Sequence, residues 1–228
     1  MPIIEPDLQR RVGGPPSREL GRDWQPPVPP PRGNGDDGGS GPEAYPPYSN
    51  ARLGMLMLLT GETVLFGGLV AAFLVLRLGA SVWPPPGQPR LPVGVTAVNT
   101  LVLIGSSYTL ARALRAVRQG DQRGLVRGLA RTAGLGALFL AVQGAEWIRL
   151  VGFGLTASSG IYGGTFYTLI GTHGAHVLGA LTWLLIVLAW AARGRYTPRE
   201  YVSLATCAMY WHFVVALWPI LYILVYLV

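Results

Sequence analysis

Five long apolar stretches, separated by short polar breaks, constrain this chain more than any other feature. They run from Ala51 to Leu78, Pro92 to Val117, Leu125 to Val151, Tyr162 to Ala192 and Tyr201 to Val228. A helix needs about 20 mostly apolar residues to cross the hydrocarbon core of a bilayer. The segments do not alternate in polarity, as the strands of a membrane barrel would. The sequence therefore predicts an all-α, polytopic membrane protein, a bundle of five transmembrane helices.

The composition supports a membrane protein and divides the chain into two regions. Half of the residues are apolar and 13% are charged, about half the charged share of a typical soluble domain. Residues 1–49 are rich in proline and glycine and hold most of the acidic side chains. Such a composition buries too little apolar surface to fold alone. We therefore expect an extended cytoplasmic N-terminal arm over residues 1–49 and a membrane domain over residues 50–228.

Arginine is the source of every basic side chain in the chain, and its distribution predicts the orientation. The second and fourth connections carry Arg112, Arg115, Arg118, Arg123, Arg127, Arg131, Arg193, Arg195 and Arg199, whereas the opposite side has Arg77, Arg90 and Arg149. By the positive-inside rule, the N-terminus is cytoplasmic and the C-terminus lies outside. Because these arginines flank apolar segments and form no surface stripe, we expect no nucleic-acid binding.

Glu62 is the first candidate functional residue, because it lies inside an apolar segment. At 1.5 Å of rise per residue it lies near the bilayer midplane, where a charge costs about 2.5 to 3.5 kcal/mol or more. We expect its carboxyl group either to be protonated or to bond to Thr60, Thr63 or an imidazole. His176 and His212 both lie within reach. A satisfied buried acid without proton traffic is an equally open interpretation.

Glu146 and Arg149 form a second polar group, near the outer membrane boundary. Their i,i+3 spacing places them on one helical face, where pairing allows both to stay charged. Gln143, one turn earlier, shares that face and can hydrogen-bond across helices. We interpret the pair as mainly structural.

The chain's three histidines, His173, His176 and His212, all lie in apolar segments. His173 and His176 at i,i+3 point two imidazoles at one site, but no carboxylate or cysteine at helical spacing completes a metal shell. The single cysteine, Cys207, forms no cluster. We therefore expect no metal site and no catalytic residue in this chain, and we expect the histidines to hydrogen-bond between helices.

Aromatic residues gather near the predicted membrane interfaces. An interfacial belt or lipid contact explains most of this set, which comprises Trp83, Trp147, Tyr162, Trp190, Tyr201, Trp218, Tyr222 and Tyr226. Recurrent glycines in the apolar segments predict a tightly packed bundle. The candidates for contact with lipid or a partner are Arg77, Trp83, Trp147, Arg149, Trp211 and Trp218.

An ordered series of motifs resembles one known family. The series begins with Gly61-Glu62 and Phe66, Trp83-Pro84-Pro85, Asn99-Thr100, Ser106-Ser107 and Gly120-Asp121. It continues with Gln143, Glu146-Trp147, Tyr162-Gly163, residues 171–177, Tyr210-Trp211-His212-Phe213, Trp218 and Tyr226. Over residues 49–228 the chain resembles subunit III of the haem-copper terminal oxidases, which comprise cytochrome c oxidases and quinol oxidases. Five helices resemble the shorter bacterial form, and Val215 stands where the family often has an acid.

The resemblance implies a non-catalytic subunit of a bacterial respiratory oxidase in the inner (plasma) membrane. Such a subunit supports subunit I, sustains proton uptake and binds phospholipid, while haem and copper belong to partner subunits. The implied partners are subunit I, subunit II and other membrane subunits, one of which we expect to hold the N-terminal arm. Glu62 matches the family's intramembrane carboxylate, which reacts with carbodiimide. The electron donor, cytochrome c or quinol, and a relation to nitric oxide reductase stay open.

The residues alone leave two other functions open. The midplane carboxylate would suit an independent proton-coupled transporter, although the sequence shows no inverted repeat or paired broken helices. The three histidines would suit a bis-His membrane cytochrome b.

Overall fold

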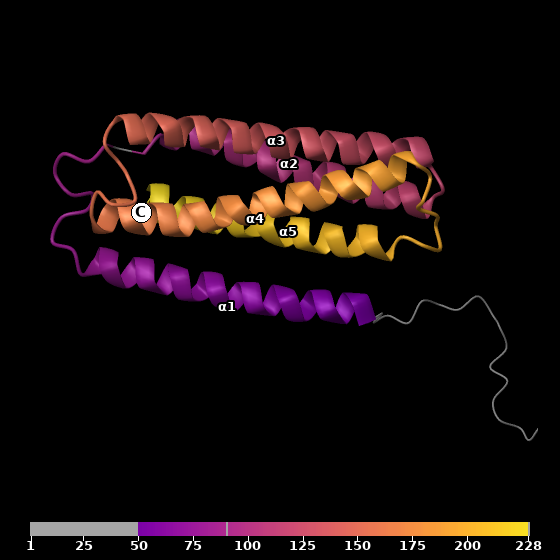
Figure 1. The fold of residues 1–228 in the computed structure, drawn as a ribbon, viewed down its shortest axis with the longest axis horizontal. Coiled ribbons are helices and arrows are strands. Elements are labelled where there is room, and N and C mark those ends of the chain that lie inside the picture. Colours follow the sequence, from indigo (N-terminus) through magenta and orange to yellow (C-terminus); the bar gives the residue numbers. More distant parts are fainter. Residues whose placement is uncertain (1–49, 90, 228) are drawn as a thin grey trace, which may run out of the picture. The chain divides into compact units, whose positions relative to one another are not determined.

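The computed structural model describes residues 50–89 and 91–227, where five long helices lie side by side (Figure 1). They are α1 (Asn50–Leu78), α2 (Val93–Arg118), α3 (Gln122–Gly152), α4 (Ile161–Ala192) and α5 (Val202–Tyr222), and α5 continues into a π-helical turn, η1 (Ile223–Leu227). Five segments are long and apolar enough to cross a membrane. The predicted all-α, five-helix membrane fold is confirmed, and the predicted arm over residues 1–49 lies outside the described residues.

The observed helices begin and end close to the predicted spans, and the clearest difference is at the start of α3. This helix begins at Gln122, one turn before the predicted Leu125. The side chain of Asp121 is the reason, because its carboxylate accepts a hydrogen bond from the backbone N–H of Gly124 at 2.8 Å. Such an N-cap satisfies a backbone donor that the first turn leaves free. The helix therefore starts within the arginine-rich connection.

Close approach of α3 to its neighbours organises the bundle. A Cβ atom at Gly128 of α3 would lie 2.7 Å from the Cβ of Ala113 on α2, so the two backbones almost touch. Two turns further on, Gly136 packs against the ring of the buried Trp211 from α5. Small residues let membrane helices pack this closely. On the other side of the bundle, α1 lies along α4 and α5 (Figure 1).

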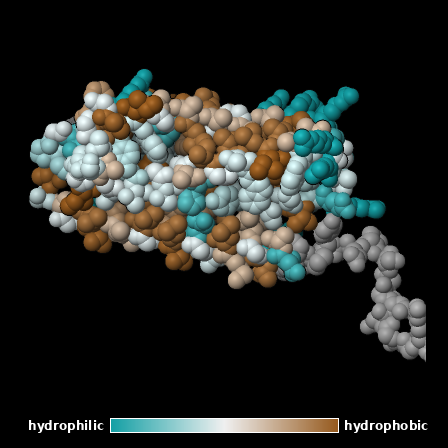
Figure 2. All heavy atoms as spheres, in the orientation of Figure 1, coloured by the Kyte–Doolittle hydropathy of each residue, from teal (hydrophilic) through white to brown (hydrophobic). Residues whose placement is uncertain are grey.

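Arginine side chains concentrate at one end of the bundle, where α1, α3 and α5 begin and α2 and α4 end. On the face shown in Figure 2, hydrophilic side chains gather at this end, and most of the surface along the helices is apolar or neutral. Arg77 and Arg149 lie at the opposite end. The assignment of the arginine-rich end to the cytoplasm stays a prediction.

Several aromatic residues that were expected at the membrane interfaces lie inside the bundle. Trp218 is 0% exposed, Tyr162 5% and Tyr226 8%, so an interfacial belt is wrong for these three. A polar atom inside the bundle can bond to another helix instead of to the membrane interface. Trp218, for example, donates its indole N–H to Thr100 Oγ1 at 2.8 Å. Trp211, 1% exposed, likewise donates to Ser106 Oγ. The expectation that Trp211 and Trp218 contact lipid or a partner is therefore wrong.

Candidate functional site

Glu62 of α1 faces His176 of α4 in the middle of the bundle. Glu62 Oε2 lies 3.0 Å from His176 Nε2, within ion-pair distance, although the alignment is not that of a straight hydrogen bond. The two side chains are 16% and 19% exposed. Glu62 lies about 18 Å along α1 from its first residue, at 1.5 Å per residue. The midplane position predicted for this carboxyl group thus has an imidazole as its partner.

The second ring nitrogen of His176 defines the protonation of this pair. Nδ1 lies 2.7 Å from the carbonyl oxygen of Thr172. A carbonyl group only accepts hydrogen bonds, so Nδ1 carries a proton. The contact between Nε2 and Glu62 then requires one further proton, which resides either on the carboxyl group or on the imidazole. The contact therefore joins a carboxyl group and an imidazole that could pass a proton between them.

Phe66 covers the pair and the neighbouring histidine from α1. Its ring, one turn after Glu62, meets the ring of His176 edge-on with the centroids 5.1 Å apart, and that of His173 at 6.3 Å. Phe66 is itself 2% exposed. Phe66 therefore places an apolar ring against the imidazole that meets Glu62.

The other candidate partners of Glu62 are engaged elsewhere. His212 of α5 hydrogen-bonds through Nδ1 to the hydroxyl group of Ser107 on α2. Thr60 and Thr63 donate their hydroxyl protons to backbone carbonyls of α1 itself. Of the two histidines within reach of Glu62, the structure thus brings His176 to the carboxyl group and leaves His212 to link α2 with α5. Sequence reasoning missed the partner Ser107.

His173 lies deeper in the bundle than His176 and has different neighbours. It is 0% exposed, and its ring stacks on Trp218 with centroids 5.0 Å apart. Neither ring nitrogen has a hydrogen-bond partner among the described residues. His173 also lines a cavity of about 390 Å³ between α3 and α4, together with Trp147. Although His173 and His176 share one face of α4, their side chains therefore do not meet at one site.

The polar group at the opposite end of the bundle matches its prediction. Arg149 donates to Glu146 at 2.8 Å, and Gln143 donates across the bundle to the hydroxyl group of Tyr226 at 3.0 Å. The ion pair at i,i+3 and the interhelical hydrogen bond of Gln143 are both confirmed. The role of Tyr226 was missed, because the sequence places it at a helix end, where an interfacial tyrosine is equally suitable.

Three further contact candidates are engaged within the chain. Arg77 donates through Nη1 to the carbonyl oxygen of Leu224 in η1 at 3.0 Å. Trp83 packs edge-on against Phe73 and Tyr162. The ring of Trp147 meets that of Tyr167 edge-on. Contacts of these three side chains with lipid or a partner stay predictions.

The arrangement can fix helices against one another and hold a proton, and it offers no converging ligand set. The three histidines have Trp218, Glu62 and Ser107 as separate partners. Within residues 50–89 and 91–227, no three His, Cys, Asp or Glu side chains form a group that could hold a metal ion. In that part of the chain the three histidines therefore do not converge on one site.

Comparisons with known proteins show one consistent similarity. A family model described as cytochrome c oxidase subunit III matches residues 41–228. A cytochrome c oxidase subunit 3 of Synechocystis sp. is 38% identical over 176 residues, 76% of this chain and 74% of the relative. A probable cytochrome c oxidase subunit 3 of Nocardia farcinica is 36% identical over 176 residues, 77% and 87% of the two chains. The counterpart in Papio hamadryas is 35% identical over 193 residues, 82% and 72% of the two chains.

Proposed function

This chain belongs to the cytochrome c oxidase subunit III family, and from that premise we propose that it is a non-catalytic accessory subunit of a bacterial respiratory oxidase. As a subunit III it is a multi-pass membrane protein of a haem-copper oxidase complex. In the proposed complex, haem and copper lie in partner subunits, of which subunit I is the main contact and subunit II a further one. The inner (plasma) membrane is its proposed location, with the N-terminus in the cytoplasm.

The proposed accessory role is supported by the way in which the chain uses its own polar residues. The three histidines have different neighbours inside the bundle and do not converge on one point, which supports a role in packing and hydrogen bonding. Oxygen reduction and proton translocation therefore belong to the complex, to which this chain contributes support. The independent transporter and the bis-His cytochrome have no support from the comparisons.

Within that role, the Glu62–His176 pair is the candidate functional centre of the chain. It holds one proton in an apolar setting and connects α1 with α4. A group of this kind can sustain hydration and protonation next to a proton-conducting partner, which is how a non-redox subunit contributes to proton uptake. We also propose that this chain binds phospholipid.

Purification through a tag on this chain tests the subunit assignment. The tagged chain is expected to carry haem-containing partners with it from the native membrane, measured by visible absorption and mass spectrometry. The chain separated from these partners is expected to show no visible haem band. Haem that stays with the separated chain would instead assign it to the membrane cytochromes.

The substitution Glu62→Gln is expected to shorten the working life of the oxidase and to leave its haem and copper content intact. A glutamine amide can donate to His176 Nε2 and so keeps the contact, but it carries no transferable proton. Loss of the ionic part of this contact removes about 1 kcal/mol, so the number of turnovers before inactivation should fall roughly five-fold. The measurement is oxygen consumption by the purified complex until activity is lost.

Two companion variants separate proton holding from packing at Glu62. Glu62→Leu removes the contact as well as the proton, so this chain should also dissociate more readily in detergent. Glu200→Gln, in an exposed connection, should behave as the wild type. Carbodiimide, which reacts with protonated carboxyl groups, is expected to label Glu62 in the wild type. Equal working lives for Glu62→Gln and the wild type would assign the pair a structural role alone.

A further inference from the structure

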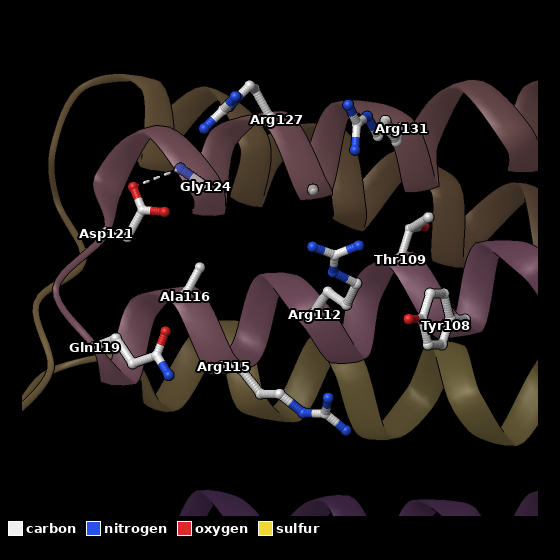
Figure 3. Close-up of a pocket in the computed structure, with 11 residues that line it drawn as sticks. Tyr108, Thr109, Arg112, Arg115, Ala116, Gln119, Asp121, Gly124, Arg127 and Arg131 are labelled. Atoms are coloured by element: carbon white, nitrogen blue, oxygen red, sulfur yellow. Dashed lines mark hydrogen bonds between the residues drawn. The ribbon is translucent and has the colours of Figure 1, made fainter.

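A pocket of about 380 Å³, lined by four arginines, lies between α2 and α3 at the arginine-rich end of the bundle. Arg112 and Arg115 come from α2, and Arg127 and Arg131 come from α3. In Figure 3, the guanidinium group of Arg112 reaches into the groove between the two helices, Arg127 and Arg131 lie on its α3 side, and Arg115 extends from α2 away from α3. This pocket is strongly cationic and so differs in chemistry from the carboxyl–imidazole pair of Glu62 and His176.

The walls of this pocket are fixed by the close crossing of the two helices. Gly128 packs against the backbone of Ala113, so α2 and α3 meet directly beneath the arginines. On the side toward the middle of the bundle, the hydroxyl groups of Thr109 and Thr132 hydrogen-bond across the helices at 2.8 Å. The arginines therefore extend from a rigid cleft, and their spacing is set by the fold.

The charge in the pocket is unbalanced. Across residues 50–89 and 91–227, the structure gives none of the four arginines an ion pair, and Arg127 donates to the backbone carbonyl of Arg123 instead. Asp121 is the one acidic residue among those lining the pocket, and its carboxylate already accepts the N–H of Gly124. Like charges held close together repel one another, so an anion in this cleft would be strongly favoured.

The helix faces that carry the arginines become apolar toward the middle of the membrane. On α2, Ile104 and Tyr108 precede Arg112 at spacings of eight and four residues, and they are 45% and 63% exposed. On α3, Leu138 follows Arg131 at a spacing of seven and is 48% exposed. Residues at these spacings share one helix face. An exposed apolar stripe thus leads directly into the cationic pocket.

The arginines also lie at the depth at which a lipid headgroup would meet them. The 31 residues of α3 span about 46 Å at 1.5 Å each, against about 30 Å for the hydrocarbon core. Arg127 and Arg131, in the second and third turns of the helix, therefore lie close to the boundary between hydrocarbon and headgroups. A charge at this boundary is stable when an anion accompanies it.

We propose that this pocket binds the phosphate group of an anionic phospholipid, whose acyl chains run along the apolar stripe of Ile104, Tyr108 and Leu138. Arginine holds phosphate oxygens through paired N–H donors, and basic pockets between membrane helices bind lipid headgroups. The inference deepens the phospholipid binding proposed above and rests on the proposed orientation for its anionic leaflet. Free phosphate would make no use of the exposed apolar stripe.

The test compares purified oxidase complexes that carry matched arginine substitutions. The pocket variant is Arg112→Gln with Arg131→Gln, and the control is Arg123→Gln with Arg199→Gln, exposed arginines at the same end but outside the pocket. Delipidated complexes are reconstituted in nanodiscs with phosphatidylglycerol or phosphatidylcholine, and the retained lipid is measured by mass spectrometry. Removing two arginines that contact the headgroup should weaken phosphatidylglycerol binding about 30-fold, and the control, whose arginines lie outside the pocket, should retain wild-type binding.

Several outcomes would overturn the proposal. Equal retention of phosphatidylglycerol by the wild type and the pocket variant would do so, as would equal loss in the control variant, which would indicate a general charge effect. Displacement of the lipid by inorganic phosphate would assign the pocket to a free anion. Cross-links from the pocket to a partner subunit would assign it to a protein contact. Haem content, measured on the same samples, reports separately whether the oxidase assignment holds.

Discussion

The substitution Gly128→Val is expected to force α2 and α3 apart and to release this chain from its complex on mild heating. Even the first side-chain carbon would lie 2.7 Å from Ala113 Cβ and 3.1 Å from Ala113 Cα. The obstacle is backbone, which no rotation of a side chain can relieve, so the helices themselves must move. Overpacking of this kind costs about 3 kcal/mol. The measurement is the midpoint temperature at which the detergent-solubilised complex loses the chain.

A matched control lies six residues further along the same helix. Gly134 has no atom near the position of a Cβ, so Gly134→Val introduces the same side chain into open space. Both variants reduce backbone freedom equally in the unfolded chain, and the difference between them isolates the helix contact. Melting of Gly128→Val and Gly134→Val at the same temperature would show that the close crossing does not support the bundle.

The substitution Trp218→Ala is expected to be at least as destabilising, because this ring joins four parts of the bundle. Its indole N–H donates to Thr100 of α2, its ring stacks on His173 of α4, and the ring of Phe139 from α3 lies nearly perpendicular to it. Truncating a buried tryptophan costs about 4 kcal/mol through lost packing and the cavity left behind. Loss of the folded chain from detergent-solubilised complexes, followed by thermal melting, measures the effect.

Smaller changes divide the effect of Trp218 into its parts. Thr100→Val removes the hydrogen-bond acceptor and keeps the ring, so it should cost about 1 kcal/mol. Trp190→Ala removes a half-buried ring that meets Arg195 at a helix end, and it should have a smaller effect than Trp218→Ala. A melting temperature for Trp218→Ala as high as that of Trp190→Ala would contradict the central position assigned to Trp218.

The sequence predicts those features of this protein that depend on a single helix. Apolar length alone identifies the five spans, because a bilayer demands about 20 apolar residues per crossing. The Glu146–Arg149 pair follows from spacing alone, because residues three apart share a helical face. These predictions need no knowledge of which helix lies beside which.

Features that depend on which helices are neighbours, and on how each helix is rotated about its axis, could not be predicted from the sequence. Whether Glu62 meets His176 or His212 depends on where α1 lies relative to α4 and α5, and both histidines lie at a suitable depth. Trp218 could face lipid or the interior at the same height in the membrane. Because α5 is apolar on all sides, its pattern gives no direction of rotation about the helix axis.

Few residues of α1 are buried, so its polar contacts matter more for holding the helix in place than they would in a well-buried helix. Met55, Phe66 and Phe73 are its buried residues, and in a bilayer apolar contacts between helices gain little over contacts with lipid tails. Glu62 with His176 and Arg77 with Leu224 are two polar contacts that tie this helix to its neighbours. The loss of one side-chain contact would therefore loosen a whole helix, because burial alone does little to hold α1 in place.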